Sequence, residues 1–469
     1  MDLTGKTVLV VGSGISGVAA TELLKKKGVR VILFDGNEEL DIEELRKKHP
    51  VFVDEEILLG EIPDRQMECI DLVVLSPGVP TDIPLVEEFR RRQIPIWGEI
   101  ELAYHYAKGR IVAITGTNGK TTTTALVGEI LANYFSDVKV VGNIGIPYTS
   151  VADETTEETV TVAEISSFQL ETTHEFCPKV SAILNITPDH LNRHHTMECY
   201  IAAKERITER QGENETCVLN YEDEVLRAFG ERIGEWVCTS QPPVSRERSG
   251  TNVLFFSSRR KLAHGLYLSE GKIFYASDGK ETLVIDVGDL QILGTHNYEN
   301  AMAAVGMALA MGVPMPKIVE ALKRFQAVEH RIEYVTEKRG VRFYNDSKGT
   351  NPDAAIKGIC AMERPTYLIG GGYDKESTYD EWIESFGGKV KKLALIGQTR
   401  EKIAECARAH GFTDIVLCDS LEEAIDVCYE NAVSGDAVLL SPACASWGMF
   451  KNYEERGRVF KEHVHSLAE

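Results

Sequence analysis

Three times along the chain, a short run of β-branched residues leads through a turn into a segment with helical spacing. The first run is residues 7–11, the second is residues 110–114, and the third begins near residue 341. Strands that alternate with helices in this way form mainly parallel sheets covered by helices. The pattern predicts an α/β fold with three domains, for which 469 residues are sufficient.

The first turn is rich in glycine and reads Gly12-Ser-Gly-Ile-Ser-Gly17. Glycines at this spacing allow a tight turn and bring backbone N–H groups close to a phosphate, beside the positive end of the helix dipole. Asp35 ends the next strand-like run, as in dinucleotide-binding folds. The first domain is therefore predicted to be Rossmann-like and to bind a nucleotide or dinucleotide. The alternative is that the glycines serve only strand–helix packing.

The second turn, Gly116-Thr-Asn-Gly-Lys-Thr121, is shorter than the usual phosphate loop G-x-x-x-x-G-K-[ST], whose first glycine would fall on Ile114. Its backbone N–H groups and the following helix suit phosphate oxygens, Lys120 neutralises their charge, and the Thr121 hydroxyl is a ligand for Mg²⁺. A structural glycine turn is the alternative. The central domain is predicted to be P-loop ATPase-like with a parallel sheet.

We expect domains of residues 1–98, 99–327 and 328–469. The third repeats the strand–helix pattern and is also predicted to be a Rossmann-like α/β domain. Between about residues 240 and 275 the sequence is polar and irregular, and we expect loops and hairpins there.

The chain has 51 Lys and Arg against 72 Asp and Glu, a net charge of -21 at pH 7. Such a molecule repels polyanions and lacks the basic excess of a duplex-binding protein. We therefore expect no nucleic-acid partner, and any anionic ligand has to be held by local groups.

Ten cysteines are scattered along the chain without a C-x-x-C pair, which speaks against a zinc ribbon or a thioredoxin motif. The N-terminus lacks the features of a signal peptide. The longest apolar stretch, residues 301–316, is shorter than a membrane span and contains glycine and proline. These features predict a cytoplasmic protein without a membrane partner.

Two polar residues follow strand-like runs of the central domain. Glu164 ends one run and His190 comes shortly after another. Because ligands of open α/β sheets gather at the carboxyl ends of strands, both side chains are candidates for the phosphate-loop crevice, with Glu164 as a Mg²⁺ ligand. A structural role is the alternative for each. Lys204 lies in a helical segment and reads as a solvated surface lysine.

Short segments spread along nearly the whole chain resemble the Mur ligase family. They are Thr115-Gly-Thr-Asn-Gly-Lys-Thr-Thr122, Gly142-Asn-Ile-Gly145, Glu164-Ile-Ser-Ser167, Asn185-Ile-Thr-Pro-Asp-His190, Tyr200-Ile-Ala-Ala-Lys204, Gly294-Thr-His-Asn-Tyr-Glu-Asn300, His330-Arg331 and Asp346-Ser-Lys-Gly-Thr-Asn351. The first glycine loop, together with Leu440-Ser-Pro-Ala-Cys-Ala-Ser446 and Lys451-Asn-Tyr-Glu-Glu-Arg-Gly457, is similar to the member that adds D-glutamate to UDP-N-acetylmuramoyl-L-alanine.

This resemblance implies an ATP-dependent acid–amino-acid ligase of peptidoglycan precursor synthesis, and hence a part in cell wall biogenesis, cell shape and cell division. ATP would phosphorylate the carboxylate of the UDP-linked substrate, and the amine of D-glutamate would attack the acyl phosphate. A tetrahedral intermediate would then release phosphate as the amide forms. Two Mg²⁺ ions and a carbamylated lysine are implied as well, and we expect a monomer.

Carried over residue by residue, the resemblance implies roles for the central and third domains. The ATP-binding residues would be Gly116, Thr117, Asn118, Gly119, Lys120, Thr121, Thr122, Asn297, Asn300, Arg331 and Asp346. The metal ligands would be Thr121, Glu164, His190 and the carbamate of Lys204, and the catalytic residues would be Lys120, His190, Lys204 and Lys348. A carbamate needs a neutral amine, and hence a lysine whose pKa is lowered.

The resemblance also implies two substrate sites, so that the apparent dinucleotide loop becomes a UDP site. The UDP-linked substrate would contact Ser13, Gly14, Ile15, Ser16, Gly17, Asp35, Ser76, Pro77, Gly78 and Asn143. The amino acid would contact Thr350, Lys375, Ser446 and Tyr453, with Lys375 suited to a glutamate carboxylate.

Three alternatives stay open. A sister ligase would add another amino acid, such as L-glutamate or a diamino acid, and Tyr453 stands where some relatives have phenylalanine. Residues 12–17 alone would also fit an NAD-dependent oxidoreductase, and the acidic surface would fit a regulatory nucleotide-binding protein without catalysis. Neither of these last two classes explains Glu164, His190 and Lys348 together.

Overall fold

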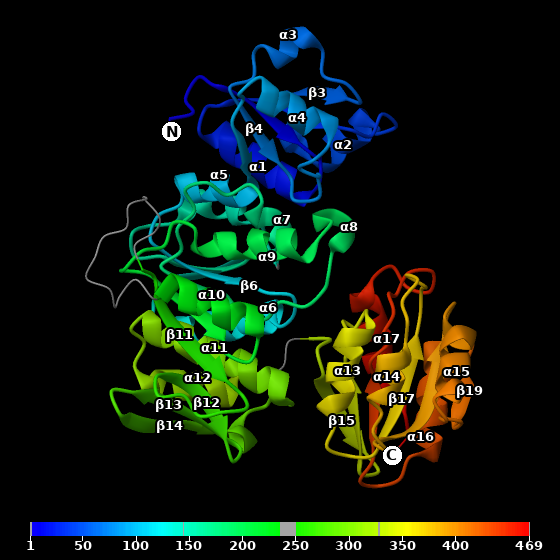
Figure 1. Ribbon diagram of the computed structural model, residues 1–469. Helices are drawn as coiled ribbons and strands as arrows, with labels where there is room; N and C mark the ends of the chain where they lie inside the picture. Colours follow the sequence, from blue (N-terminus) through cyan, green and yellow to red (C-terminus); the bar gives the residue numbers. More distant parts are fainter. Residues whose placement is uncertain (1, 144, 235–249, 327–328, 469) are drawn as a thin grey trace. The chain divides into compact units, whose positions relative to one another are not determined.

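The computed structural model describes residues 2–143, 145–234, 250–326 and 329–468. Its strands form three sheets, of five, nine and six strands (Figure 1). The chain divides into two compact units, Met1–Ile285 with Glu299–Leu322, and Asp286–Tyr298 with Lys323–Glu469. The first unit contains the first two sheets and the second unit contains the third. The predicted three-domain α/β fold is confirmed, while the boundaries after residues 98 and 327 stay predictions; residues 327–328 lie outside the described ranges.

The first sheet is parallel throughout, in the order β3-β2-β1-β4-β5. Its strands are β1 (Thr7–Val11), β2 (Arg30–Asp35), β3 (Glu56–Leu59), β4 (Leu72–Leu75) and β5 (Ile96–Gly98), and its helices are α1 (Ile15–Lys26), α2 (Ile42–Lys48), α3 (Asp64–Met67) and α4 (Pro84–Arg91). Alternate residues of β1 face opposite sides: Val10 packs in the core that includes α1, and Leu9 in the core that includes α4. Because β1 and β4 are parallel neighbours, the loops after them leave from the same edge.

The second sheet has the order β14-β13-β12-β11-β10-β9-β6-β8-β7. Its strands are β6 (Arg110–Thr115), β7 (Val138–Gly142), β8 (Val160–Glu164), β9 (Val180–Ile183), β10 (Thr216–Asn220), β11 (Asn252–Ser257), β12 (Gly265–Ser269), β13 (Lys272–Ser277) and β14 (Lys280–Asp286). The helices are α5 (Glu99–Tyr106), α6 (Lys120–Ala132), α7 (Ser167–Leu170), α8 (Leu191–His194), α9 (Met197–Glu205), α10 (Glu224–Gly234), α11 (Thr295–Ala310) and α12 (Met315–Arg324). Strands β9, β6 and β8 are parallel neighbours, so the segments that follow them meet at one edge.

The third sheet has the order β15-β16-β20-β17-β18-β19, with β15 antiparallel to β16. Its strands are β15 (Glu333–Lys338), β16 (Val341–Asn345), β17 (Thr366–Gly371), β18 (Val390–Ile396), β19 (Ile415–Leu417) and β20 (Ala437–Leu440). The helices are α13 (Pro352–Cys360), α14 (Asp380–Glu384), α15 (Arg400–Ala409), α16 (Leu421–Asn431) and α17 (Tyr453–Ser466). Side chains of α13, α14 and α15 share one core, and those of α16 and α17 share the other.

The polar segment at residues 240–275 is only partly as expected. A β12–β13 hairpin is present, but β11 joins the sheet as a parallel neighbour of β10, where loops and hairpins had been predicted. The part around Pro242 lies outside the described residues. The strand was missed because its polar flanks hide a short apolar run, and pairing with β10 depends on contacts distant in sequence.

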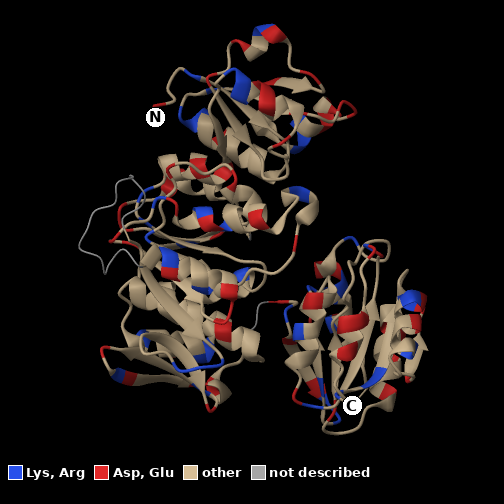
Figure 2. Cartoon of the chain, in the orientation of Figure 1, with Lys and Arg blue, Asp and Glu red and all other residues tan. Residues whose placement is uncertain are grey.

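The apolar stretch at residues 301–316 lies mostly in α11, and among the described helices none is long and apolar enough to cross a membrane. Acidic and basic side chains are interspersed over the helices and loops of the chain (Figure 2). The negative charge is therefore spread over the chain. The net charge does not predict the charge of the candidate site, which depends on the residues that form it.

Candidate active site

The loop between β6 and α6 is fixed by residues that follow the neighbouring strand β9. The Asn185 side chain accepts a hydrogen bond from the Asn118 N–H (2.8 Å) and donates one to the Asn118 carbonyl oxygen (3.0 Å). The Thr117 hydroxyl donates to the Thr187 carbonyl oxygen (3.1 Å). Gly119 has a φ of 85°, a conformation that residues with a Cβ rarely adopt. The loop backbone is therefore held in place at the N-terminus of α6, where a phosphate is favoured.

Lys120, the first residue of α6, folds back over this loop. Its Nζ atom donates to the carbonyl oxygens of Gly116 (2.9 Å) and Thr117 (2.8 Å). Thr121 and Thr122 follow in the first turn of α6 and are buried. The ammonium group thus lies at the loop that is predicted to hold phosphate oxygens, and Thr121 lies beside it.

Lys204 on α9 is 1% exposed, so its interpretation as a surface lysine is wrong. Its Nζ atom donates to the Gly116 carbonyl oxygen (2.9 Å) and lies 4.6 Å from the ring centroid of Tyr200. Burial, followed by the charge of Lys120, lowers the pKa of Lys204 well below its ordinary value. A lysine that gives up its proton easily meets the chemical requirement for a carbamate, which itself stays a prediction.

Glu164 at the end of β8 has one satisfied and one unsatisfied carboxylate oxygen. Oε1 accepts a hydrogen bond from the Asn143 side chain (2.8 Å), whereas Oε2 is buried and has no hydrogen-bond partner. Leaving a buried carboxylate oxygen unpaired costs free energy, which a divalent cation would offset. Glu164 therefore fits the predicted metal site, and Asn143 orients its carboxylate.

His190 lies beyond β9 and is half exposed, with a φ of 52°. Its ring packs edge-to-face against Phe168, with ring centroids 4.9 Å apart. The guanidinium of Arg193 also lies 4.9 Å from the Phe168 ring centroid. The orientation of His190 therefore depends on an aromatic residue of α7 and on the neighbouring helix α8.

Arg193 and Glu171 form a largely buried ion pair with 2.7 Å between their nitrogen and oxygen atoms. Arg193 also donates to the Val79 carbonyl oxygen (2.9 Å), and the Thr81 hydroxyl donates to Glu171 (3.1 Å). These bonds connect α8, which follows His190, with the loop after β4. A cavity beside them is lined by Thr81, Asp82, Glu171, Arg193, His195 and residues of α9.

The two loops of the first sheet that are predicted to hold UDP lie together at its edge. Asp35 accepts hydrogen bonds from the N–H (3.0 Å) and hydroxyl (2.6 Å) of Ser13. Although burial alone would raise it, these bonds and the Asn37 N–H lower the pKa of Asp35 below its ordinary value. A Cβ at Gly17 would collide with the Gly12 carbonyl oxygen, so α1 closely approaches the loop. Ser76, which begins Ser76-Pro77-Gly78, lies against Gly12, while Ile15 is largely exposed.

In the second unit, Asp346 follows β16 and is buried. Its Oδ2 accepts a hydrogen bond from the hydroxyl of Ser441, which follows the neighbouring strand β20 (2.7 Å). Burial raises the pKa of Asp346 to about 7, although Ser441 and the charge of Arg331 act in the opposite direction. The Nε atom of Arg331 is buried without a hydrogen-bond partner. Asp346 and Arg331 therefore interact electrostatically, and the Arg331 Nε–H group can donate a hydrogen bond to a ligand.

Lys348 and Tyr453 lie together: the Lys348 Nζ atom is 5.3 Å from the Tyr453 ring centroid. The hydroxyl of Ser347 donates to the Tyr453 carbonyl oxygen (2.8 Å), and the fully buried Arg456 donates to the Ser347 hydroxyl (3.0 Å) and carbonyl oxygen (2.7 Å). Arg456 thus fixes the start of α17 against the segment after β16.

The remaining predicted acceptor residues lie at the same edge of the third sheet. Ser446 is buried after β20, and Thr350 donates its N–H to the Lys348 carbonyl oxygen (2.9 Å). The Lys375 Nζ atom lies 4.9 Å from the ring centroid of Trp447, which is 53% exposed. Trp447 also packs edge-to-face with Tyr373. An aromatic residue next to Ser446 thus supports Lys375.

The predicted residues form three groups. The first-sheet loops form one, Lys120, Lys204, Glu164 and their neighbours form the second, and Asp346, Lys348, Lys375 and Tyr453 form the third. Asn300 on α11 lies against Gly119 in the second group, whereas Asn297, which bonds to the Leu293 carbonyl oxygen (2.8 Å), falls in the other compact unit.

The structure shows further residues that position the predicted site residues and to which the sequence motifs assign no role. They are Asn185, Phe168, Glu171, Arg193, Ser441 and Arg456. Asn185, Ser441 and Arg456 lie within the segments that resemble the Mur ligase family. Their place in those segments could have indicated a role in the site. Phe168, Glu171 and Arg193 act through contacts distant in sequence.

Comparison with known families assigns three regions of the chain. Residues 6–98 match the family model "Mur ligase MurD-like, N-terminal domain", residues 114–308 match "Mur ligase middle domain", and residues 330–444 match "Mur ligase, glutamate ligase domain".

Two curated relatives are similar over their full length. A UDP-N-acetylmuramoylalanine--D-glutamate ligase of Lachnoclostridium phytofermentans is 58% identical over 100% of this chain and 99% of its own. A ligase of the same name from Lachnospira eligens is 55% identical over 100% of both chains. Among solved structures, the Thermotoga maritima UDP-N-acetylmuramate-alanine ligase MurC has a TM-score of 0.59 at 20% identity and covers 98% of this chain and 99% of its own. At this identity, the structural similarity shows a shared fold.

Proposed function

The chain belongs to the Mur ligase family, and we propose that it joins D-glutamate to UDP-N-acetylmuramoyl-L-alanine with cleavage of ATP to ADP and phosphate. The reaction is a step of peptidoglycan precursor synthesis. The structural observation that carries the proposal is the burial of Lys204 against the phosphate loop, at the sheet edge that also holds Glu164 with its unpaired oxygen.

In the proposed reaction, a carboxylate oxygen of the UDP-linked substrate attacks the γ-phosphorus of ATP, and ADP leaves. The amine of D-glutamate then attacks the acyl carbon, giving a tetrahedral intermediate. Collapse of the intermediate forms the amide and releases phosphate, while the amine loses a proton. The chemical difficulty is that a carboxylate and a polyphosphate, both anions, have to approach each other.

Mur ligases use ATP and Mg²⁺. We propose two ions in this chain, held by Thr121, Glu164, His190 and a carbamate on Lys204. Glu164 Oε2 supports the assignment because a buried carboxylate oxygen without a partner suits a hard divalent cation. When bound, Mg²⁺ neutralises phosphate charge and stabilises the charge that develops during phosphoryl transfer.

In this proposal, residues of the central sheet hold the phosphates of ATP, and residues of the second unit contribute to binding the rest of the nucleotide. Backbone N–H groups of residues 116–119 bind phosphate oxygens, and Lys120 moves its ammonium group from loop carbonyls to the phosphates. Thr122 and Asn300 border the loop, and Asn297, Arg331 and Asp346 bind the rest of the nucleotide. Arg331 is suited to this role because its Nε donor is buried and unpaired.

The first sheet binds the UDP group through the loop of residues 13–17, Asp35 and the Ser76-Pro77-Gly78 turn. This is supported by the close packing of the two loops at one edge and by Asp35, which orders Ser13. Asn143 then lies at the acyl end of the substrate, next to Glu164.

The third sheet binds the amino acid. Lys348 is placed by Tyr453 near the reacting carboxylate, and Lys375 pairs with a glutamate carboxylate. Thr350 and Ser446 complete the pocket with hydroxyl groups.

We also propose a cytoplasmic location, in agreement with nine free cysteines among the described residues. We further propose a monomeric state, which gel filtration tests.

Phosphate release from ATP, measured with and without the UDP-linked substrate and each candidate amino acid, tests the proposal. Release that requires both UDP-N-acetylmuramoyl-L-alanine and D-glutamate supports it. Release with L-glutamate or a diamino acid instead identifies a sister ligase, and release that needs neither substrate overturns the ligase mechanism. An NAD-dependent oxidoreductase would instead change the absorbance of NADH.

A further inference from the structure

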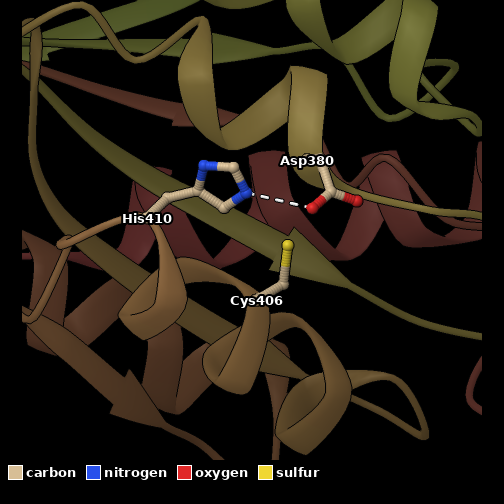
Figure 3. A group of neighbouring side chains, drawn as sticks. All are labelled: Asp380, Cys406 and His410. Carbon is tan, nitrogen blue, oxygen red and sulfur yellow. Dashed lines mark hydrogen bonds and ion pairs between the residues drawn. The ribbon is translucent and has the colours of Figure 1, made fainter.

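Two helices of the second unit bring a carboxylate, a thiol and an imidazole together (Figure 3). Asp380 begins α14, Cys406 lies on α15 and His410 caps the end of α15. One ligand atom from each of the three lies within 4.8 Å of the others, and His410 Nε2 is 3.0 Å from Asp380 Oδ1.

The local sequence explains this convergence. Cys406 and His410 are four residues apart, so they lie on one face of α15 in successive turns. His410 also stands at the helix C-terminus, where the helix dipole favours a positive charge. A cation held there would be bound by a rigid pair of ligands, with Asp380 supplied from the facing helix.

A fourth residue occupies the position of a supporting carboxylate. His410 Nδ1 lies 3.5 Å from Glu384 Oε1, while Nε2 faces Asp380. Histidines that bind a metal through one ring nitrogen characteristically donate the other N–H to a carboxylate, which fixes the tautomer. In His410, Nε2 therefore lies where it could bind a metal ion beside Asp380, and Nδ1 lies where it could donate to Glu384.

A surface ion pair between His410 and the two carboxylates, with the Cys406 thiol hydrogen-bonded to Asp380, is the simpler explanation and involves no metal. The nearby Lys402 pairs with Asp374 (3.0 Å) and not with this group. A cation among these groups would instead bind the sulfur, the imidazole nitrogen and the carboxylate oxygen at once.

We propose that Asp380, Cys406 and His410 bind one zinc ion and that Glu384 orients His410. Sulfur, nitrogen and oxygen ligands together suit a borderline-soft cation with tetrahedral geometry, and water would fill the fourth position. Ligand atoms in such a site lie roughly 3.3–3.8 Å apart, so the side chains, whose ligand atoms here lie within 4.8 Å of one another, would draw together on binding the ion. The ion would connect α14 to α15, and this site is independent of the proposed ligase reaction.

Cobalt titration of the reduced, chelator-treated full-length chain tests the proposal. Excess Mg²⁺ is present to occupy oxygen-ligand sites, and Co²⁺ is followed by its thiolate charge-transfer band. We expect one equivalent of Co²⁺ to bind and one equivalent of Zn²⁺ to remove the band. Cys406→Ser should abolish the band, whereas Cys360→Ser, which changes an exposed thiol elsewhere in the same unit, should leave it unchanged.

Two further variants distinguish ligation from loss of folding. His410→Gln should abolish one-to-one binding, and Glu384→Gln should retain binding but weaken it by about 10- to 100-fold, as loss of a supporting carboxylate does. Circular dichroism shows whether each variant keeps the wild-type fold. A wild-type chain that gives no thiolate band, a Cys406→Ser variant that keeps it, or a folded Glu384→Gln variant with unchanged affinity would overturn the proposal.

Discussion

Lys120 and Lys204 donate hydrogen bonds to the same atom: the carbonyl oxygen of Gly116 lies 2.9 Å from both Nζ atoms. Lys204 is removed from solvent, and in addition two ammonium groups that share one neutral acceptor repel each other. Protonation of Lys204 is therefore disfavoured, and its pKa lies well below the ordinary value of a lysine.

Lys204→Ala is expected to reduce ligase activity by about a hundredfold or more, the size of effect typical for loss of a positioned charged group. Added formate or acetate should restore part of the activity, because a short carboxylate can take the place of the carbamate. Lys272→Ala, on an exposed strand end, is the control and should remain active without carboxylates. Initial rates of phosphate release provide the measurement. Full activity of Lys204→Ala would contradict the proposed metal-ligand role.

Arg193→Gln is expected to raise the KM for the UDP-linked substrate about tenfold, equivalent to about 1.4 kcal/mol, with the KM for ATP changed less. The reason is that Arg193 connects α8 with the loop after β4 through Glu171 and the Val79 carbonyl oxygen. Arg232→Gln is a matched control, because the Arg232–Glu205 pair is more exposed and contributes about 0.5 kcal/mol or less. Equal changes of both KM values would argue against a specific effect on the UDP loop.

Asp346 should make the stability of the chain depend on pH. Its pKa is about 7 when folded and 3.8 ordinarily, so the folded state binds more protons between these values. The free energy of unfolding therefore falls as pH rises from about 3.8 to about 7, by up to about 4 kcal/mol from this group. Asp346→Asn should lack this contribution, so its stability relative to wild type should increase with pH. Denaturation at pH 5 and pH 7 measures this, and a constant difference would contradict it.

Trp447→Leu is expected to raise the KM for D-glutamate roughly fivefold, because a cation over an aromatic ring gains about 1 kcal/mol at a partly exposed site. Trp447→Phe keeps an aromatic face for Lys375 and should recover most of the affinity. Steady-state kinetics with varied D-glutamate provides the measurement. If the leucine and phenylalanine variants behaved alike, the ring would not support Lys375.

Much of the fold could be predicted because its signals are local. Strands such as Thr7–Val11 and Arg110–Thr115 are continuous apolar runs, and the glycine loops after them mark the sheet edges. Glu164 was identified as a ligand candidate because it ends such a run. The strand Asn252–Ser257 was missed because its pairing partner, β10, is distant in sequence.

The parts that sequence could not show depend on packing between elements. The prediction that Lys204 is a surface residue was wrong because the sequence of its helix does not indicate the phosphate loop, distant in sequence, against which the lysine packs. The raised pKa of Asp346 likewise arises from burial by elements distant in sequence, and the hydrogen bond from Ser441, 95 positions away, opposes it. Family resemblance marked both positions, while the structure supplies the physical reason for their shifted pKa values.

A competition between glutamate enantiomers tests the central claim most directly. The enzyme receives ATP, Mg²⁺, UDP-N-acetylmuramoyl-L-alanine and equal amounts of unlabelled L-glutamate and isotopically labelled D-glutamate, and the product is weighed by mass spectrometry. We predict a product one glutamyl residue heavier that carries the label. An unlabelled glutamyl product, or no ATP-dependent product at all, would contradict the proposed function.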